Sequence, residues 1–148
     1  MRNYVGLMLG ALARRKWKRY VSSQYGVAFE HPPNWIEIEK DRYQGRDGFF
    51  ELSAAAGAGG LEDVCRQEAY HRFQPYGTDP TIKFLKYDAR DACYIFPSED
   101  QPKEMKAQAA FYVEYPVPLH LHGETYRYLV FWSDEGHIRN IVRKLKFL

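Results

Sequence analysis

Two histidines and a glutamate at alternate positions form the arrangement in this sequence that comes nearest to a metal-binding motif. On an extended segment His120, His122 and Glu124 would point to the same side, and zinc accepts imidazole and carboxylate ligands. Two prolines precede this segment and a glycine interrupts it, which is typical of a connection between strands. We therefore expect the three side chains to be solvated in a turn, with metal binding as the weaker interpretation and no cofactor.

The two cysteines of the chain offer a second kind of chemistry. A disulfide between Cys65 and Cys93 would close a loop of about 29 residues and stabilise the fold by about 3.6 kcal/mol in the chain-entropy model. The alternative is a pair of small buried hydrophobic residues, since free cysteines are common in protein cores. Both interpretations stay open. Without a C-x-x-C pattern, a redox enzyme or a zinc site is disfavoured.

Residue types that serve as nucleophiles occur without the neighbours that would activate them. Ser98 lacks the flanking glycines of a hydrolase nucleophile, and Cys65 falls on an apolar stripe. The glycine-rich segment 57–60 precedes a predicted helix but lacks the Lys-Ser/Thr pair of a phosphate-binding loop. We expect no catalytic residue, and an enzyme is the less favoured class.

Two polar segments are candidates for a surface that contacts a partner. Residues 76–80 and 97–106 are rich in turn residues and poor in core residues, so we expect exposed loops there. The side chains expected at this surface are Tyr76, Asp79, Ser98, Glu99, Asp100, Gln101 and Lys103.

The charge of the chain is divided unevenly along its length. Of 148 residues, 45% are hydrophobic and 16% aromatic, which fits one globular domain. The net charge is +2, but residues 1–20 carry six Lys/Arg and no acid, so residues 21–148 have a balance of −4. A mildly acidic domain is not expected to bind nucleic acid.

Residues 1–20 form a basic leader or N-terminal helix ahead of a single domain at 21–148. The apolar run at 4–13 is shorter than the roughly 20 residues that span a bilayer. Three interpretations follow: a helical arm docked on the domain or on a partner, a peripheral membrane anchor through residues 1–19, or a degraded export signal.

The apolar patterns predict an α+β fold that would hold these segments in place. Alternating residues predict strands at 25–30, 35–39, 49–54, 82–87, 92–96, 109–115 and 126–132. Helical spacing predicts a helix from Leu61 to Phe73, and another that Ser133 caps and that continues to Leu145. Short connections favour a central antiparallel sheet of about six to seven strands with helices on its faces, an αβα sandwich.

The start of the domain and the order of its elements resemble a known family. The domain opens with a strand that contains glycine, an apolar residue and an aromatic residue, and Pro-x-x-Trp follows this strand. In this sequence the motif is Tyr25-Gly26-Val27-x-Phe29-x-x-Pro32-x-x-Trp35. A third strand, a helix, four strands and a terminal helix follow. Over residues 20–148 this resembles the PsbP-like fold family, which includes the PsbP subunit of photosystem II, DcrB-type lipoproteins and a Ran-binding nuclear-transport factor. The resemblance is nearest to the bacterial extracytoplasmic members.

The resemblance implies an αβα sandwich with a binding or assembly role and no shared catalytic set. It also implies an extracytoplasmic or membrane-associated location, although the leader departs from the exported members and leaves a cytoplasmic location open. We therefore expect a non-enzymatic module that contacts a protein partner near a membrane. The alternatives are a small-ligand carrier or enzyme with a pocket between sheet and helix, and an immunity or chaperone-type protein that pairs its sheet edge with another chain.

Overall fold

The computed structural model describes residues 16–148. The apolar part of the predicted leader, and with it the choice between arm, anchor and export signal, lies outside the described residues. Lys18, Arg19 and Tyr20, which we grouped with the leader, belong to the first strand because they pair with the second strand, Tyr20 opposite Phe29.

Ten strands and two α-helices make up the described chain. The strands before the first helix are β1 (Lys18–Ser22), β2 (Val27–His31), β3 (Ile36–Glu39), β4 (Arg42–Gln44) and β5 (Phe49–Ala55). Helix α2 (Leu61–Ala69) is followed by β6 (Thr81–Tyr87), β7 (Arg90–Phe96), a short 3₁₀ turn (Lys103–Met105), β8 (Gln108–Leu121) and β9 (Glu124–Asp134). Helix α3 (Ile138–Val142) and β10 (Lys146–Phe147) end the chain.

Most of the strands form one large sheet. Its order is β3-β4-β5-β9-β8-β7-β6, so β3 and β6 are its edge strands. Each pairing in the sheet is antiparallel. A register shift between Glu37 and Glu39 interrupts the regular pairing of β3. The α+β class and the antiparallel sheet predicted from the sequence are confirmed.

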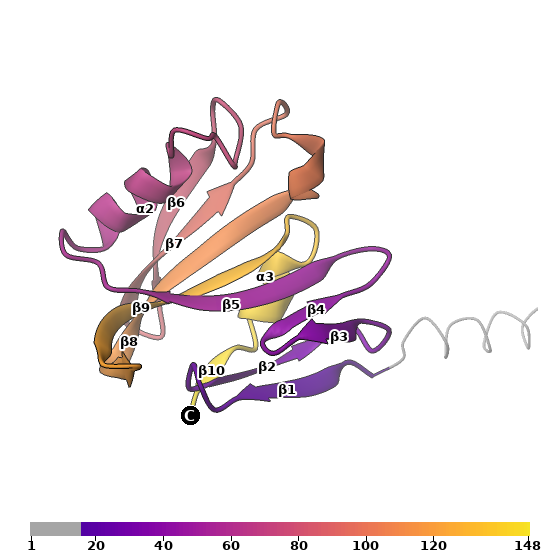
Figure 1. The fold of residues 1–148 in the computed structure, drawn as a ribbon, viewed down its shortest axis with the longest axis vertical. Helices are drawn as coiled ribbons and strands as arrows, with labels where there is room; N and C mark the ends of the chain where they lie inside the picture. Colours follow the sequence, from indigo (N-terminus) through magenta and orange to yellow (C-terminus); the bar gives the residue numbers. More distant parts are fainter. Residues whose placement is uncertain (1–15) are drawn as a thin grey trace, which may run out of the picture.

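A second sheet of three strands, β1-β2-β10, was not predicted. Two of its members escaped prediction: β1 overlaps the end of the segment assigned to the leader, and β10 has only two residues, which we expected to follow a helix. Figure 1 shows these strands gathered beside one end of the large sheet, with the C-terminus among them.

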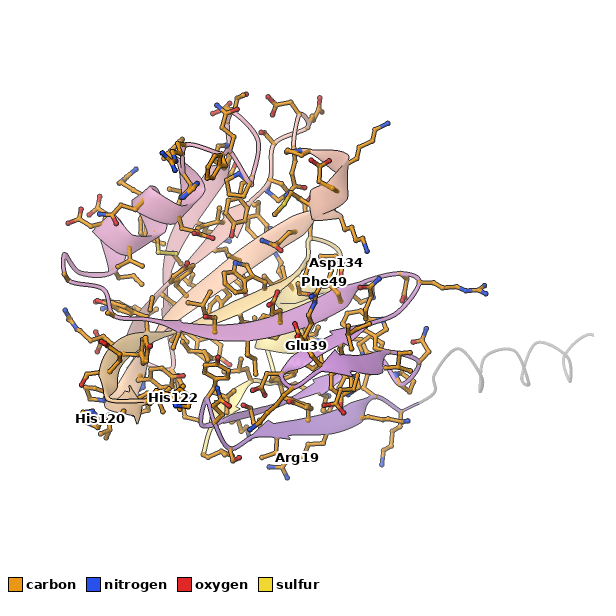
Figure 2. The ribbon with its side chains drawn as sticks, viewed as in Figure 1. Arg19, Glu39, Phe49, His120, His122 and Asp134 are labelled. Atoms are coloured by element: carbon orange, nitrogen blue, oxygen red, sulfur yellow. A yellow bond between two sulfur atoms is a disulfide. The ribbon has the colours of Figure 1, made fainter. Side chains whose placement is uncertain are left out.

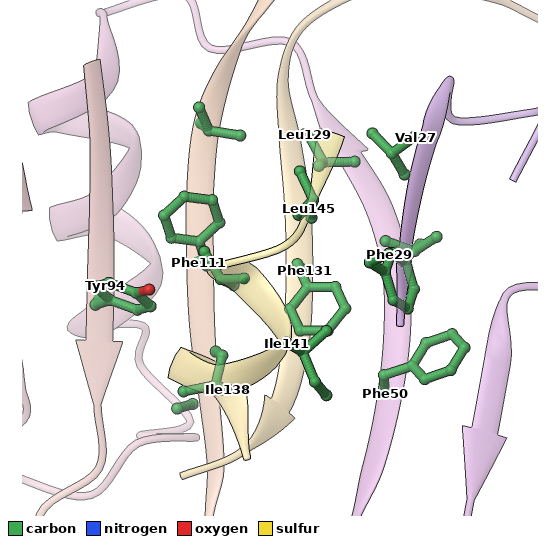
Figure 3. Packing of buried hydrophobic residues seen from close by; sticks show 14 of the residues in the cluster. Val27, Phe29, Phe50, Tyr94, Phe111, Leu129, Phe131, Ile138, Ile141 and Leu145 are labelled. Atoms are coloured by element: carbon green, nitrogen blue, oxygen red, sulfur yellow. The ribbon is translucent and has the colours of Figure 1, made fainter. Parts of the chain in front are cut away.

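Alternation along the central strands sends side chains to opposite faces of the large sheet. On β8, Phe111 joins one buried cluster with Phe131 and Ile141, while its neighbour Tyr112 joins another with Cys65. Helix α2 therefore covers one face, and α3 covers the other together with the small sheet, whose Phe29 ring lies 4.8 Å from the ring of Phe50 (Figure 3).

The predicted C-terminal helix is wrong at both ends. Ser133 and Asp134 are not its first turn but the last residues of β9, because they pair with Ala109 and Gln108 of β8. Their ladder hydrogen bonds outweigh the local preference for a helix cap. Helix α3 keeps only five residues, although the apolar stripe that predicted it, Ile138, Ile141, Val142 and Leu145, is buried as expected.

Helix α2 starts at Leu61 as predicted but ends at Ala69, four residues earlier than the apolar stripe suggested. Phe73 lies beyond it and is 71% exposed. The strand β4 was also missed, since three half-buried residues are too few to show an alternation.

Candidate functional site

The two polar segments expected to form a partner surface lie against each other. The backbone N–H of Ser98 donates to the carbonyl of Tyr76 (2.9 Å), and the N–H of Asp79 donates to Ser98 Oγ (3.1 Å). Gln101 Nε2 donates to the carbonyls of Pro75 (3.0 Å) and Gln108 (2.9 Å). The turn before β6 and the loop after β7 are therefore one connected structure.

Asp100 is the centre of this connection. Its carboxylate accepts hydrogen bonds from Ser98 Oγ (2.6 Å) and from the backbone N–H of Thr78 (3.0 Å), and also from the Thr78 hydroxyl. The hydrogen bonds from Ser98 and Thr78 lower the pKa of this carboxyl to about 2. Asp100, predicted as a partner contact, is thus engaged in holding the loops together.

Tyr76 was predicted at the surface and is fully buried. The hydroxyl of Tyr76 donates to Glu68 Oε2 (2.7 Å) and accepts from Trp132 Nε1 (2.9 Å), which connects α2, the turn before β6 and β9. Burial, and then the neighbouring Glu68 carboxylate, raise the pKa of Tyr76 well above its ordinary value, so this hydroxyl stays a donor. Sequence reasoning failed because a lone aromatic in a polar turn gives no periodicity.

Three of the predicted contacts remain free to meet another molecule. Asp79, Glu99 and Lys103 are exposed, as is Thr78, which directly precedes Asp79. We call these four side chains, with the two loops that carry them, the two-loop surface.

A cavity of about 340 Å³ lies between α2 and the large sheet, bordered by the glycine-rich segment 57–59. The polar side chains around it are those of Asp63, Gln67, Glu68, His71 and Tyr112. Burial is the main cause that raises the pKa of the Tyr112 hydroxyl, and the Glu68 carboxylate adds to it. The cavity thus has two carboxylates and a protonated phenol at its wall.

The candidate metal residues lie at the tight turn of the β8–β9 hairpin. His120 pairs opposite Thr125 in the β8–β9 ladder, its Nδ1 2.9 Å from the Thr125 hydroxyl, and His122 occupies the turn with a φ of 52°. All three residues are exposed (Figure 2 labels the two histidines), and no metal-binding group of three or more His, Cys, Asp or Glu occurs within residues 16–148. The strands run closer to the turn than predicted because Pro116 and Pro118 fall where the β8–β9 register shifts, between Glu114 and Leu119.

Cys65 of α2 and Cys93 of β7 are joined by a disulfide, with 6.8 Å between their Cα atoms. The bond fastens the helix to β7, the strand next to the edge strand β6 of the large sheet.

Sequence reasoning missed a polar cluster at the end of β9. His137 Nδ1 lies 2.7 Å from Asp134 Oδ2, and His137 Nε2 lies 3.6 Å from Asp47 Oδ2. The Trp35 indole donates to Asp47 Oδ1 (2.9 Å), which is the main cause lowering the pKa of Asp47. The only sequence signal was one histidine three residues after an aspartate.

This cluster pairs a carboxylate with an imidazole, as general bases do, but the nearby hydroxyl is not free to act with it. Ser133 Oγ donates to the carbonyl of Phe49 (2.7 Å), and the N–H of Phe49 donates to Asp134 Oδ1 (3.1 Å). Figure 2 shows Phe49 and Asp134 side by side. The cluster therefore fastens the β4–β5 loop to the start of α3.

Among the described residues, no helix combines the length and the hydropathy needed to cross a bilayer.

Comparisons with known proteins add a likeness of fold. No protein-family model matches the chain, and none of the curated proteins does. The chain is similar to the solution structure of cyanobacterial PsbP (CyanoP) from Synechocystis sp. PCC 6803, with a TM-score of 0.48 and 11% sequence identity over 88% of this chain and 92% of that one. Values of this size support no conclusion on family or activity.

Proposed function

We propose that this protein is a non-enzymatic binding or assembly module of the PsbP-like type, and that it contacts a protein partner near a membrane through the two-loop surface. The observation that carries the proposal is the set of hydrogen bonds that Asp100 accepts from Thr78 and Ser98.

Those bonds matter because a rigid loop binds at a lower entropic cost than a mobile one. Ordering a rotamer-rich side chain or a loop on association costs about 0.5–1.5 kcal/mol per immobilised side chain. Here the backbone of both loops is already held by side chains inside the surface, and the outward side chains of Asp79, Glu99 and Lys103 stay available.

Gly77 shows how closely the two loops fit. Its φ is +86°, and a Cβ built on it would lie 2.1 Å from Ser98 Oγ and 2.6 Å from Asp100 Oδ1. A side chain at this position would therefore push the loops apart.

The PsbP-like assignment is supported by the residues that first indicated it. Val27, Phe29 and Trp35 are all buried and belong to one core cluster with Ile138 and Leu145. A location outside the cytoplasm is supported by the Cys65–Cys93 disulfide, since such bonds persist in oxidising compartments.

The test is capture of a partner from detergent-solubilised membranes of the source cells, with a double variant, Asp79→Ala with Glu99→Ala. Both side chains are exposed, so the melting temperature should not change, while the captured protein should fall at least tenfold. The matched control removes two exposed carboxylates elsewhere, Glu37→Ala with Glu124→Ala, and should capture as the wild type does. Equal capture by both variants would exclude the two-loop surface.

A second candidate function, a carrier of a small cationic ligand, is favoured by the cavity under α2. Its volume of about 340 Å³ lies at the lower end of ligand pockets, and Asp63 and Glu68 give it negative charge. Thermal shift measurements with choline and spermidine would test this function. Stabilisation that the Tyr112→Phe variant loses would support it, and no stabilisation of the wild type would count against it.

A further inference from the structure

A groove of about 520 Å³ lies on the outer side of the small sheet and beside the end of α3. Its lining brings together Arg19 from β1, Ala28, Phe29 and Glu30 from β2, and Arg143, Lys144 and Lys146 from the C-terminal segment. We call this the basic groove. It combines residues from both ends of the chain, which no local pattern in the sequence could reveal.

Strand register explains why the cations share one side. Arg19 pairs opposite Glu30, and Lys146 pairs opposite Ala28, so these four positions face away from the large sheet. The intervening residues, such as Phe29, have their side chains in the core. Figure 2 shows Arg19 projecting from β1 away from the body of the protein.

The groove is strongly positive within a domain that is acidic overall. Four of its lining side chains are cationic and one is anionic. Glu30 is 3.3 Å from Lys144 and offsets that charge. Within residues 16–148 no ion pair engages Arg19, Arg143 or Lys146, so three positive charges remain for a ligand.

Two large apolar side chains lie next to these charges. Val21 is 49% exposed and pairs opposite Ala28, the same residue that Lys146 faces from the other side. Leu148 is 66% exposed, and its backbone N–H donates to the carbonyl of Gly26 (2.9 Å), two residues beyond Lys146. Cations beside exposed apolar side chains are the combination that binds the surface of an anionic bilayer.

We propose that the outer face of the small sheet docks on an anionic bilayer, with the phosphate of a lipid headgroup in the basic groove and Val21 and Leu148 at the acyl boundary. The charge complementarity favours phosphate, and the exposed apolar pair favours a bilayer over a free anion. This membrane contact uses other residues than the two-loop surface does.

The test is cosedimentation of the full-length protein with vesicles of equal parts phosphatidylglycerol and phosphatidylcholine, at physiological ionic strength. The groove variant is Arg143→Gln with Lys146→Gln, and the control is Lys40→Gln with Lys83→Gln, two exposed lysines outside the groove and the two-loop surface with the same change in net charge. All proteins keep the leader, so its contribution is constant.

A Lys or Arg at an anionic surface contributes about fivefold in affinity, so the groove variant should bind about thirtyfold more weakly than the wild type. The control should stay within about threefold, since distant charges are screened. A Val21→Ser, Leu148→Ser variant should also bind more weakly while its response to salt is unchanged.

Three results would overturn the proposal. The groove variant could bind as the wild type does, which would assign membrane contact to another surface. Inorganic phosphate or poly-glutamate could bind the groove, seen as amide shifts of residues 143–146, while vesicles do not bind. Vesicles of phosphatidylcholine alone could bind equally well, which would remove the charge argument.

Discussion

Tyr76 is a single side chain that joins three elements. Its hydroxyl links Glu68 of α2 to Trp132 of β9, and the ring is fully buried. Asp100 acts in a similar way on the surface, because one carboxylate holds Thr78 and Ser98 together. Both residues were predicted as partner contacts; Tyr76 is buried, whereas Asp100 is exposed and also connects the two loops.

The Tyr76→Phe variant is expected to be less stable by about 1–3 kcal/mol, because Trp132 Nε1 and the Glu68 carboxylate each lose a buried partner. Urea unfolding followed by tryptophan fluorescence measures the difference. Tyr70→Phe removes a hydroxyl from an exposed ring and should leave the midpoint unchanged. An unchanged midpoint for both variants would mean that the network contributes nothing.

The ionisation of Asp100 should make the stability of the protein depend on pH. Its pKa is about 2 in the folded state and about 3.9 in an unfolded chain, so the ionised carboxylate stabilises the fold at neutral pH. That contribution is fully present above about pH 4 to 5 and is lost as the pH falls towards about 2. The measurement is the melting temperature of wild type and Asp100→Asn at a series of pH values.

The wild type should melt at a higher temperature than Asp100→Asn at neutral pH, and the gap should close in acid. A gap of constant size across that range would show that the geometry of the amide, and not the charge of the carboxylate, makes the difference.

Turns between strands show how an element tolerates an unfavourable residue. Asp88 and Ala89 connect β6 to β7 with φ angles of 50° and 64°, the left-handed values of a two-residue hairpin turn. For a residue with a Cβ, that conformation is higher in free energy by about 1–2 kcal/mol. The turn forms because seven residue pairs of the hairpin fix its ends.

Replacing Ala89 by glycine should therefore stabilise the protein by about 1 kcal/mol, measured as a higher urea midpoint. Ala56→Gly is the control, since Ala56 is exposed and its φ is not positive; it should be neutral or slightly destabilising. A lower midpoint for Ala89→Gly would contradict the prediction, because it would show that the positive φ of Ala89 carries no strain that glycine relieves.

At the scale of the molecule, the disulfide ties the layer of α2 to the sheet. In the chain-entropy model, closing the loop between residues 65 and 93 stabilises the fold by about 3.6 kcal/mol, mainly by restricting the unfolded chain. Urea unfolding with and without a reductant should show a loss of that order. A Cys65→Ala, Cys93→Ala variant should match the reduced protein and should not respond to reductant.

The sequence predicted what depends on local pattern. The central strands and the start of α2 follow from alternation and helical spacing, and the buried stripe from Ile138 to Leu145 follows from the same rule. It did not predict the small sheet, because β10 has two residues and pairs with β2 far away along the chain. The end of β9 was missed for a related reason, since its pairing with β8 decides the conformation of Asp134.

The candidate sites divide in the same way. The two loops could be predicted because polar turn residues are typical of exposed segments. In the structure the two loops lie against each other. Which of their side chains point outward depends on hydrogen bonds between segments, so the burial of Tyr76 was not predicted. The basic groove joins Arg19 to Lys146, and only the completed fold brings them together.

The open edges of the large sheet bear on self-association. A strand whose backbone faces solvent can act as a template on which another copy adds its own strand, the first step towards fibrils. Both edges carry features that hinder this addition: the register shift between Glu37 and Glu39 bends β3, and exposed Lys83 and Lys86 charge β6. The protein should therefore stay dispersed at concentrations where a flat, uncharged edge would aggregate.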